Sequence, residues 1–167
     1  MTSTVTGSVP DEADRPHLQR AVDLAAQALA TGNEPFGSVL VGADGTVLAE
    51  DYNRESEGDP TMHPELTLAR WAALNLTPEE RAAATVYTSG EHCAMCASAH
   101  AYCGVGPIVY ASSSEQLGTW WAELGAERAP LAPLRITDVA PEIPVRGPFE
   151  EYAEQVHRLL VARFTQG

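Results

Sequence analysis

The chain has 167 residues, of which 44% are apolar and 20% charged, a balance typical of one soluble globular domain with its own core. No apolar run approaches the ~20 residues needed to span a membrane, and the first residues lack the basic and apolar stretches of a secretion signal, so we expect a cytoplasmic protein with no membrane partner. The net charge of −13 argues against a protein that holds nucleic acid by its phosphates, and because all ten basic residues are arginines, phosphate-binding and Schiff-base lysines are excluded.

The N-terminal part is predicted to be an acidic tail followed by a helix. Residues 1–13 are polar and aperiodic, so we interpret them as a disordered tail and residues 14–167 as one domain. Asp14 can cap a helix and Pro16 suits its first turn, while Gly32 ends it. The apolar stripe of this helix is formed by Leu18, Val22, Ala25 and Leu29.

The rest of the chain alternates between strands and helices. In chain order we expect a hairpin of 36–41 and 46–49 around an Asp-Gly turn, a helix over 64–75, a short capped turn at 77–80, a strand at 85–88, a helix from 93 to 104, a strand at 108–110, a weak helix over 114–124 and an amphipathic helix from 149 to 160. Five prolines between 129 and 148 restrict any strands near Ile136 and Ile143 to short or edge positions. This alternation predicts a three-layer α/β/α domain.

Two short motifs, each at the start of a predicted helix, hold the residues suited to chemistry. The first contains His63 and Glu65, and the second contains Cys93 and Cys96 in CxxC spacing. Residues three apart on a helix project from one face, so both thiols point the same way. His63 precedes Pro64, which favours a cap position just outside the helix. Where two such helix starts converge, one imidazole and two thiolates form a three-ligand set for zinc.

The number of protein ligands distinguishes a catalytic from a structural zinc site. Structural sites are closed by four protein ligands, whereas catalytic sites keep three and a water. The positive ends of two helix dipoles favour the thiolate forms of Cys93 and Cys96. Glu65 follows His63 by two residues, where its carboxylate can take a proton from the water and deliver it to a leaving amine. Such a set of groups suits hydrolysis at an electron-poor carbon that bears an amino group.

The CxxC spacing alone also fits a redox pair or a coincidence. A redox pair leaves the upstream His-x-Glu without a role. His100 and Cys103 share the helical stripe of the thiols, but seven residues of helix separate His100 from Cys93 by about 10 Å, too far for a shared ion. The sequence leaves two interpretations of Glu91: it has a role in the site, or its negative charge simply favours the nearby helix N-terminus.

The two motifs resemble the signature of the zinc-dependent nucleobase and nucleotide deaminases. That signature is His-x-Glu followed some thirty residues later by Cys-x-x-Cys, here residues 63–65 and 93–96. The match is closest to the small guanine and cytosine deaminase branch, whose pattern also has Pro-Phe-Gly opening the first strand and Asn closing the second, here residues 35–37 and Asn53. The resemblance covers roughly residues 15–112.

This resemblance implies a cytidine-deaminase-like α/β fold with a mixed central sheet, and it assigns roles within the site. By that analogy His63, Cys93 and Cys96 hold Zn²⁺, and Glu65 moves the proton. Asn53 hydrogen-bonds the base, and the backbone amide of Cys93 lies near the reacting carbon. Members of the family commonly pair, some by exchanging C-terminal helices, so a homodimer is expected.

The chain departs from the family pattern at two positions. His92 stands where proline is usual, and Pro64 stands where alanine is commoner. His92 could line the pocket, contact the substrate or cap the helix. Trp120 and Trp121 could close over a flat ring or pack in the core, and Phe36 favours the core. The candidate substrate contacts are Asn53, Pro64, His92, Phe36, Trp120 and Trp121.

These inferences predict a zinc-dependent hydrolytic deaminase that acts on a free nucleobase or a related amino-heterocycle, uses water and releases ammonia. Guanine, cytosine and their modified, aza or triazine analogues are the first substrates to test. A tRNA adenosine deaminase shares the motifs but needs a basic face, which this acidic chain lacks. A third hypothesis is a zinc-stabilised binding module without catalysis, which requires a fourth protein ligand, with His92 the only nearby candidate.

Overall fold

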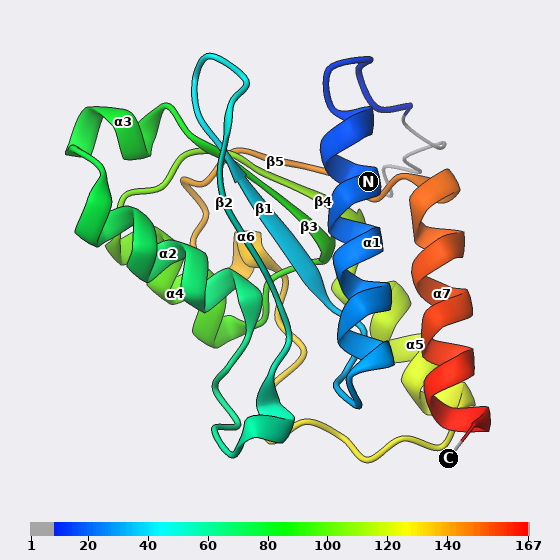
Figure 1. The fold of residues 1–167 in the computed structure, drawn as a ribbon. Coiled ribbons are helices and arrows are strands. Elements are labelled where there is room, and N and C mark those ends of the chain that lie inside the picture. Colours follow the sequence, from blue (N-terminus) through cyan, green and yellow to red (C-terminus); the bar gives the residue numbers. More distant parts are fainter. Residues whose placement is uncertain (1–8, 167) are drawn as a thin grey trace, which may run out of the picture.

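A five-stranded mixed sheet forms the middle layer of the protein (Figure 1). The computed structural model describes residues 9–166. The strand order is β2-β1-β3-β4-β5, with β1 antiparallel to β2 and β3, and with β3, β4 and β5 parallel to one another. The strands are β1 (Gly37–Val41), β2 (Val47–Tyr52), β3 (Thr85–Gly90), β4 (Ile108–Ser112) and β5 (Val145–Arg146). Because β3 and β4 run parallel, the loops that follow them begin at the same edge of the sheet.

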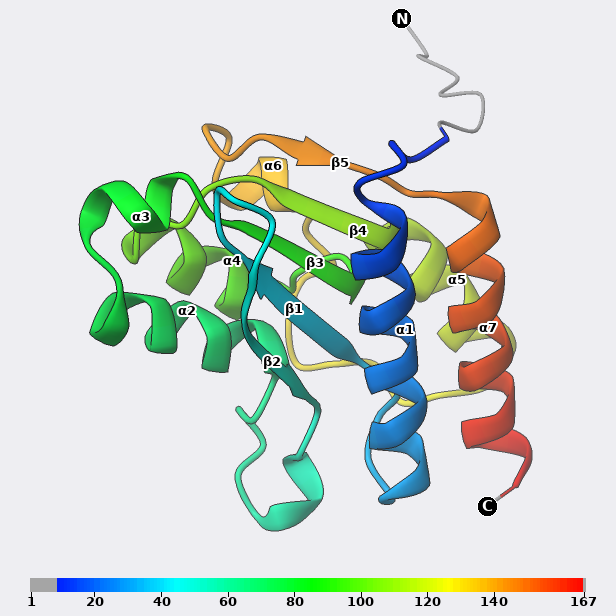
Figure 2. The same ribbon diagram turned by 45° about the horizontal axis from the view of Figure 1, so that its top comes forward.

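Helices cover both faces of this sheet (Figures 1 and 2), which confirms the predicted three-layer architecture. α1, α5 and α7 lie on one face, and α2, α4 and α6 lie on the other. The helices are α1 (Arg15–Ala30), α2 (Pro64–Asn75), α3 (Pro78–Ala82), α4 (Ala94–Tyr102), α5 (Ser114–Glu123), α6 (Ile136–Val139) and α7 (Glu150–Thr165), with a 3-10 turn η1 (Glu55–Glu57).

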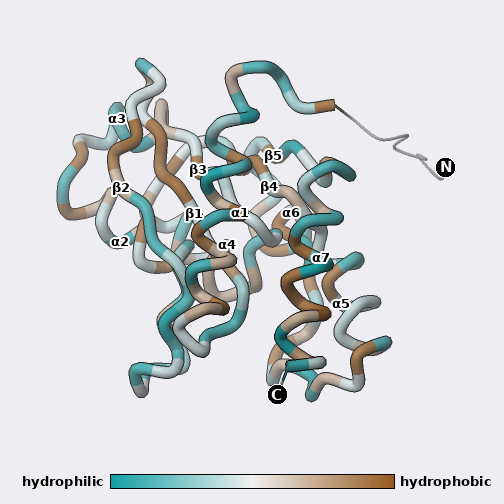
Figure 3. The backbone as a smooth tube through the Cα atoms, turned by 45° about the vertical axis from the view of Figure 1, so that its right-hand side comes forward, coloured by the Kyte–Doolittle hydropathy of each residue, from teal (hydrophilic) through white to brown (hydrophobic). Residues whose placement is uncertain are grey.

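The largest apolar core lies between the sheet and the pair α1 and α7. In Figure 3, brown hydrophobic residues alternate with teal hydrophilic ones along α7, as expected for a helix with one buried stripe. Gly37 sets how closely α1 approaches β1. A Cβ at this position would lie 2.4 Å from the carbonyl oxygen of Ala21 and 2.5 Å from Cβ of Leu24, so only glycine allows this packing. Fully buried core residues include Leu18, Ala21, Val39, Val109, Val156 and Leu160.

The structure departs from the sequence predictions in two segments. Ile136 begins the short helix α6 and does not lie in a strand, whereas the edge strand β5 follows Ile143 closely and is two residues long. The proposed tail over 1–13 mostly lies outside the described residues. Within its described part, the backbone amide of Asp11 donates to the Asp14 carboxylate and Pro10 is buried, so the chain is already held against the domain before residue 14.

Asp14 does not cap α1 through its side chain. Its buried carboxylate accepts hydrogen bonds from the Tyr87 hydroxyl at 2.9 Å and from Nη2 of Arg146 at 2.9 Å. These contacts join the start of α1 to the middle strand β3 and the edge strand β5. Burial alone would raise the pKa of Asp14, but the hydrogen bonds from Arg146 and Tyr87 outweigh it and hold this pKa below its usual value.

We expect Asp14→Ala to lower the free energy of unfolding at pH 7 by about 1.5–3 kcal/mol, the contribution of hydrogen bonds to a charged group. Because the pKa of Asp14 is lowered in the folded state, its stabilisation is complete above the unfolded-state pKa of about 3.9 and is lost as the pH falls through the folded-state value. Urea unfolding at pH 7, 5 and 3 should therefore show a gap between wild type and variant that is the same at pH 7 and 5 and narrower at pH 3. The exposed Asp23→Asn on α1 is the control, and a gap independent of pH would contradict this role.

No helix within residues 9–166 combines the length and the apolar character required to cross a membrane.

Candidate metal centre and active site

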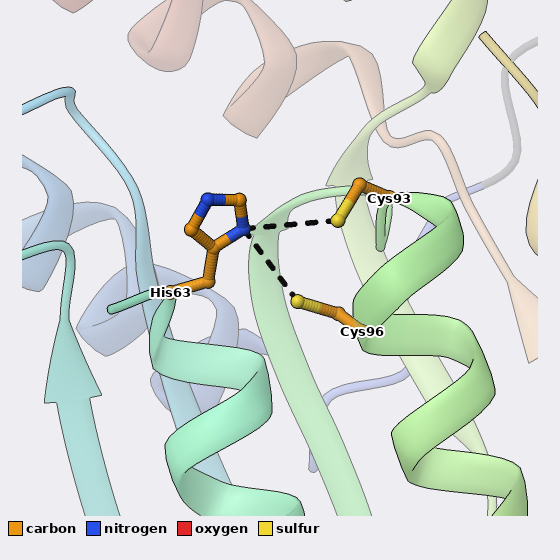
Figure 4. Close-up of side chains that lie close together, drawn as sticks. All are labelled: His63, Cys93 and Cys96. Atoms are coloured by element: carbon orange, nitrogen blue, oxygen red, sulfur yellow. Dashed lines mark hydrogen bonds between the residues drawn. The ribbon is translucent and has the colours of Figure 1, made fainter. Parts of the chain in front are cut away.

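The N-terminal ends of α2 and α4 lie side by side next to the end of β3 (Figure 4). His63 is the N-cap of α2, with an extended backbone (φ −86°, ψ 138°), and Pro64 follows it in the first turn. Cys93 is the N-cap of α4 and is also extended (φ −69°, ψ 171°), while Cys96 lies one turn further on. The predicted convergence of the two helix starts is present, and it brings three side chains from two motifs together.

The three side chains have the spacing of a zinc site. Nδ1 of His63 lies 3.7 Å from Sγ of Cys93 and 3.6 Å from Sγ of Cys96, and all three ligand atoms are within 4.8 Å of one another. A tetrahedral zinc ion with bonds of about 2.1 Å to nitrogen and 2.3 Å to sulfur separates its ligand atoms by about 3.6–3.8 Å. Both nitrogen–sulfur separations therefore match those of a tetrahedral zinc site. Within the described part of the chain no fourth His, Cys, Asp or Glu joins this group.

The protonation of the cluster without metal follows from the same short distances. The thiol of Cys96 and the ring of His63 lower the pKa of Cys93 to about 4. The hydrogen bond to Cys93 raises the pKa of His63 to about 9. The contact with the Cys93 thiolate and burial raise the pKa of Cys96. The cluster thus holds one thiolate, one thiol and one imidazolium at neutral pH, so a metal must displace the protons of His63 and Cys96.

Glu65 lies in the first turn of α2, directly behind the ligands. Its side chain is buried, and Oε1 accepts hydrogen bonds from Oγ1 of Thr88 at 3.1 Å and from Oγ of Ser38 at 3.4 Å. Burial raises the pKa of Glu65 above its usual value. A raised pKa makes this carboxylate a better proton acceptor than an exposed one, which suits a general acid–base.

Residues 11–112 match the family model for the cytidine and deoxycytidylate deaminase zinc-binding region. The chain belongs to this deaminase family. The His/Cys/Cys cluster is the zinc-binding site typical of it, and its cytidine-deaminase-like fold is the predicted one.

Curated relatives in the family carry several substrate names. The chain is 32% identical to a probable cytosine deaminase of Schizosaccharomyces pombe over 64% of each chain, and 37% identical to guanine deaminase of Bacillus subtilis over 57% of this chain and 62% of that protein. It is also 32% identical to a tRNA-specific adenosine deaminase of Haemophilus influenzae, over 66% of this chain and 64% of that protein. The matches thus span less than two thirds of these relatives' lengths.

Solved structures share the fold across the whole chain. A mutant of a protein named NE0047, in complex with 8-azaguanine, superposes with a TM-score of 0.74 and 19% identity, covering 100% of this chain and 99% of that one. Guanine deaminase from Nitrosomonas europaea gives a TM-score of 0.66 at 17% identity, with 98% of both chains covered. At this identity the likeness concerns the fold alone.

A small cavity of about 70 Å³ opens beside the deaminase zinc site. Three of the predicted substrate contacts line it together with two of the ligands and two carboxylates: Phe36, Asn53, Pro64, His63, Cys93, Glu65 and Glu91. Asn53 is fixed by a residue that the sequence reasoning missed. Its Nδ2 donates to Oε2 of Glu55 at 2.7 Å, and its Oδ1 accepts from the backbone amide of Glu55 at 3.1 Å. Oε1 of Glu55 also lies 3.5 Å from Nε2 of His63.

The other predicted contacts are placed differently. His92 is 1% exposed, lines neither this cavity nor the larger one described below, and lies against His100 with ring centroids 5.4 Å apart. Burial lowers the pKa of His92, so we interpret it as a neutral core side chain. Trp120 stacks on His157 at 4.6 Å and packs against the main core, whereas Trp121 lines the larger cavity.

Glu91 has a positioning role that the sequence left open. Its buried carboxylate accepts a hydrogen bond from the backbone amide of Ser114 at 3.1 Å and another from that of Ile136 at 2.8 Å. These amides are the first of α5 and α6, so one side chain joins two distant helix starts to the loop that carries Cys93. No local sequence signal predicts this, because both partners are distant in the chain.

Proposed function

We propose that the protein is a hydrolytic deaminase of a free nucleobase or a related amino-heterocycle. The observation that carries this proposal is the buried carboxylate of Glu65 beside a three-ligand site. A closed structural zinc site has four protein ligands, whereas three ligands leave a position for water. A binding module without catalysis gives no reason to bury a carboxylate at that position.

The residues divide the work of hydrolysis among them. Zinc held by His63, Cys93 and Cys96 would supply a bound water whose pKa is lowered toward ~7. Glu65 is placed to accept a proton from the attacking water as its oxygen bonds to the amino-bearing carbon and the C=N electron pair moves onto the ring nitrogen. It then gives this proton to the amino nitrogen. The ring electron pair re-forms the C=N bond as the bond to the amino nitrogen breaks, ammonia leaves, and the hydroxy product tautomerises to the oxo form.

The residues around the small cavity orient the substrate ring. The amide of Asn53, held in one orientation by Glu55, retains one N–H and one lone pair for the edge of the ring. The N-terminal ends of α2 and α4 place a partial positive charge beside the carbon under attack and favour the negative charge that develops there.

A small neutral substrate is supported by the charge and by the relatives. The net charge of −13 repels a phosphate backbone. Cytosine and guanine deaminases are among the relatives, and a structure of the same fold contains 8-azaguanine. The decisive test is an ammonia-release screen over free bases, nucleosides and triazine analogues with the zinc-loaded protein. Ammonia from at least one ring supports the proposal, and none from any ring overturns it.

A tRNA adenosine deaminase is the second candidate, because the Haemophilus influenzae relative is as similar as the cytosine deaminase. A tRNA substrate predicts tight binding whose affinity falls steeply with added salt. Filter binding with tRNA at two salt concentrations, combined with inosine formation, distinguishes it from the base deaminase.

We also infer a homodimer. Leu74 and Tyr102, on the packed helices α2 and α4, are 82% and 93% exposed, so a second copy of the chain could cover them. Sedimentation of the wild type should show a dimer, and Tyr102→Glu should shift it toward monomer. Glu79→Gln on the exposed helix α3 is the control, and a wild type that sediments as a monomer at all concentrations contradicts the inference.

A further inference from the structure

The small cavity beside the zinc ligands, with a volume of about 70 Å³, is the narrow end of the site. A substrate larger than a bare ring must extend beyond it. Two of its lining residues, Glu91 and Cys93, also line a second cavity of about 870 Å³. The two cavities are therefore neighbours on either side of Glu91 and the ligand Cys93, and the larger one falls in the range of about 300–1,000 Å³ typical of small-molecule sites.

The walls of this larger cavity are mainly apolar. One side is α5, and the other is the segment 126–135, here called the strap, which runs from α5 to α6 along the lower side of the molecule (Figure 1, yellow). Leu131 and Leu134 of the strap are 45% and 41% exposed although they line the cavity, so a ligand could still bury apolar area there. The apolar lining includes Leu117, Trp121, Ala122, Leu131, Pro133 and Leu134.

The strap is attached to the domain only near its ends. The backbone amide of Ala126 donates to the carbonyl of Trp121 at 2.9 Å, and the amide of Ile136, just after the strap, donates to Glu91. Within the described chain, residues 127–134 make no hydrogen bond with any residue outside the strap. The side chains of the strap can therefore adjust to a ligand without breaking secondary structure. The hydrogen bond from Ile136 to Glu91 fixes the C-terminal end of the strap close to Cys93.

We propose that the larger cavity binds an apolar substituent of the substrate, so that the preferred substrate is an amino-heterocycle carrying an aryl or alkyl group and not the bare base. This inference rests on the deaminase function proposed above. A phosphate-bearing substituent is disfavoured because Glu115, Glu127 and Asp138 share the cavity with its arginines, and Arg135 is paired with Asp138 at 3.1 Å. The substituent must leave the ring on the edge opposite the amino-bearing carbon, because that carbon faces the ligands.

Matched pairs of compounds test this directly. In cytosine, N1 lies across the ring from the amino-bearing C4, and in guanine the ring atom farthest from the amino-bearing C2 is C8. We expect kcat/KM for 1-benzylcytosine over cytosine, or for 8-benzylguanine over guanine, to be higher by about tenfold or more, as burial of the two leucines would give. The double variant Leu131→Ser/Leu134→Ser should lower this benzyl-to-bare ratio about tenfold. Val47→Ser, on an equally exposed (44%) apolar residue of β2 that lines neither cavity, should leave it unchanged.

Failure of this inference differs from failure of the proposed function. A benzyl-to-bare ratio near one, or a ratio unaffected by the double variant, overturns the role of the cavity. A double variant that changes sedimentation but not the ratio also overturns it, because a second copy would then cover the leucines. If no compound yields ammonia, the deaminase proposal fails. Calorimetric binding of the benzyl compounds to the zinc-loaded protein then decides: about tenfold weaker binding to the double variant supports the cavity, and equal binding overturns it.

Discussion

Replacing Glu65 by glutamine is expected to lower ammonia release by about 10²–10⁴-fold while zinc stays bound, since a positioned general acid–base contributes a factor of this size. Glutamine keeps the volume and the carbonyl oxygen, so Thr88 and Ser38 retain an acceptor. It cannot take a proton from water or return one to the amine. Steady-state ammonia release, together with elemental analysis for zinc, separates loss of catalysis from loss of metal.

The control is Glu57→Gln, an exposed carboxylate of η1 that has no contact with the cluster. It should keep the wild-type rate. Full activity in Glu65→Gln would remove Glu65 from proton transfer. Loss of zinc along with activity would instead assign it to holding the site together, a role that its hydrogen bonds to β1 and β3 could also serve.

The metal site was predictable because its determinants are local. A proline after His63 and the start of a helix at Cys93 fix both residues as N-caps, and the structure shows α2 beginning at Pro64 and α4 at Ala94. CxxC spacing then orients the two thiols by helix geometry alone. What local rules could not give is the convergence of two helices thirty residues apart, which came from the family resemblance.

The residues that brace the site were not predictable in the same way. Glu55 holds Asn53, and Glu91 holds the amides of Ser114 and Ile136. A carboxylate that accepts from a distant backbone amide leaves no periodic or spacing signal. The same lack of a local signal explains the error near Ile136: the sequence predicts a short strand there, whereas Ile136 starts a helix whose first amide donates to Glu91.

Burial was the other quantity that the sequence could not supply. His92 replaces a usual proline beside a ligand and was therefore assigned to the pocket as one option, but it is packed against His100 inside the α4 side of the domain. Trp120 and Trp121 are adjacent in a helix, so they point in directions about 100° apart, and only one can face the cavity.

Removal of the metal should have the second-largest effect, because the ligands join α2 to α4. When free zinc exceeds its dissociation constant 100-fold, binding adds about 2.7 kcal/mol to the stability, or about 5–10 °C in Tm for a chain of this size. A chelator should remove this increment in a thermal unfolding experiment. The affinity should also fall with acidification, because protons on His63 and Cys96 compete with the metal.

The three cysteines offer a matched pair of variants for this experiment. Cys96→Ser should abolish stoichiometric zinc, the response of Tm to chelator and ammonia release together. Cys103→Ser should retain all three, because Cys103 caps the C-terminal end of α4 and packs against the core on the α2 side, outside the ligand group. If Cys96→Ser still bound one zinc with unchanged affinity, the metal would have to be held elsewhere, and the positions of His63 and Cys93 at two helix N-termini would lose their explanation.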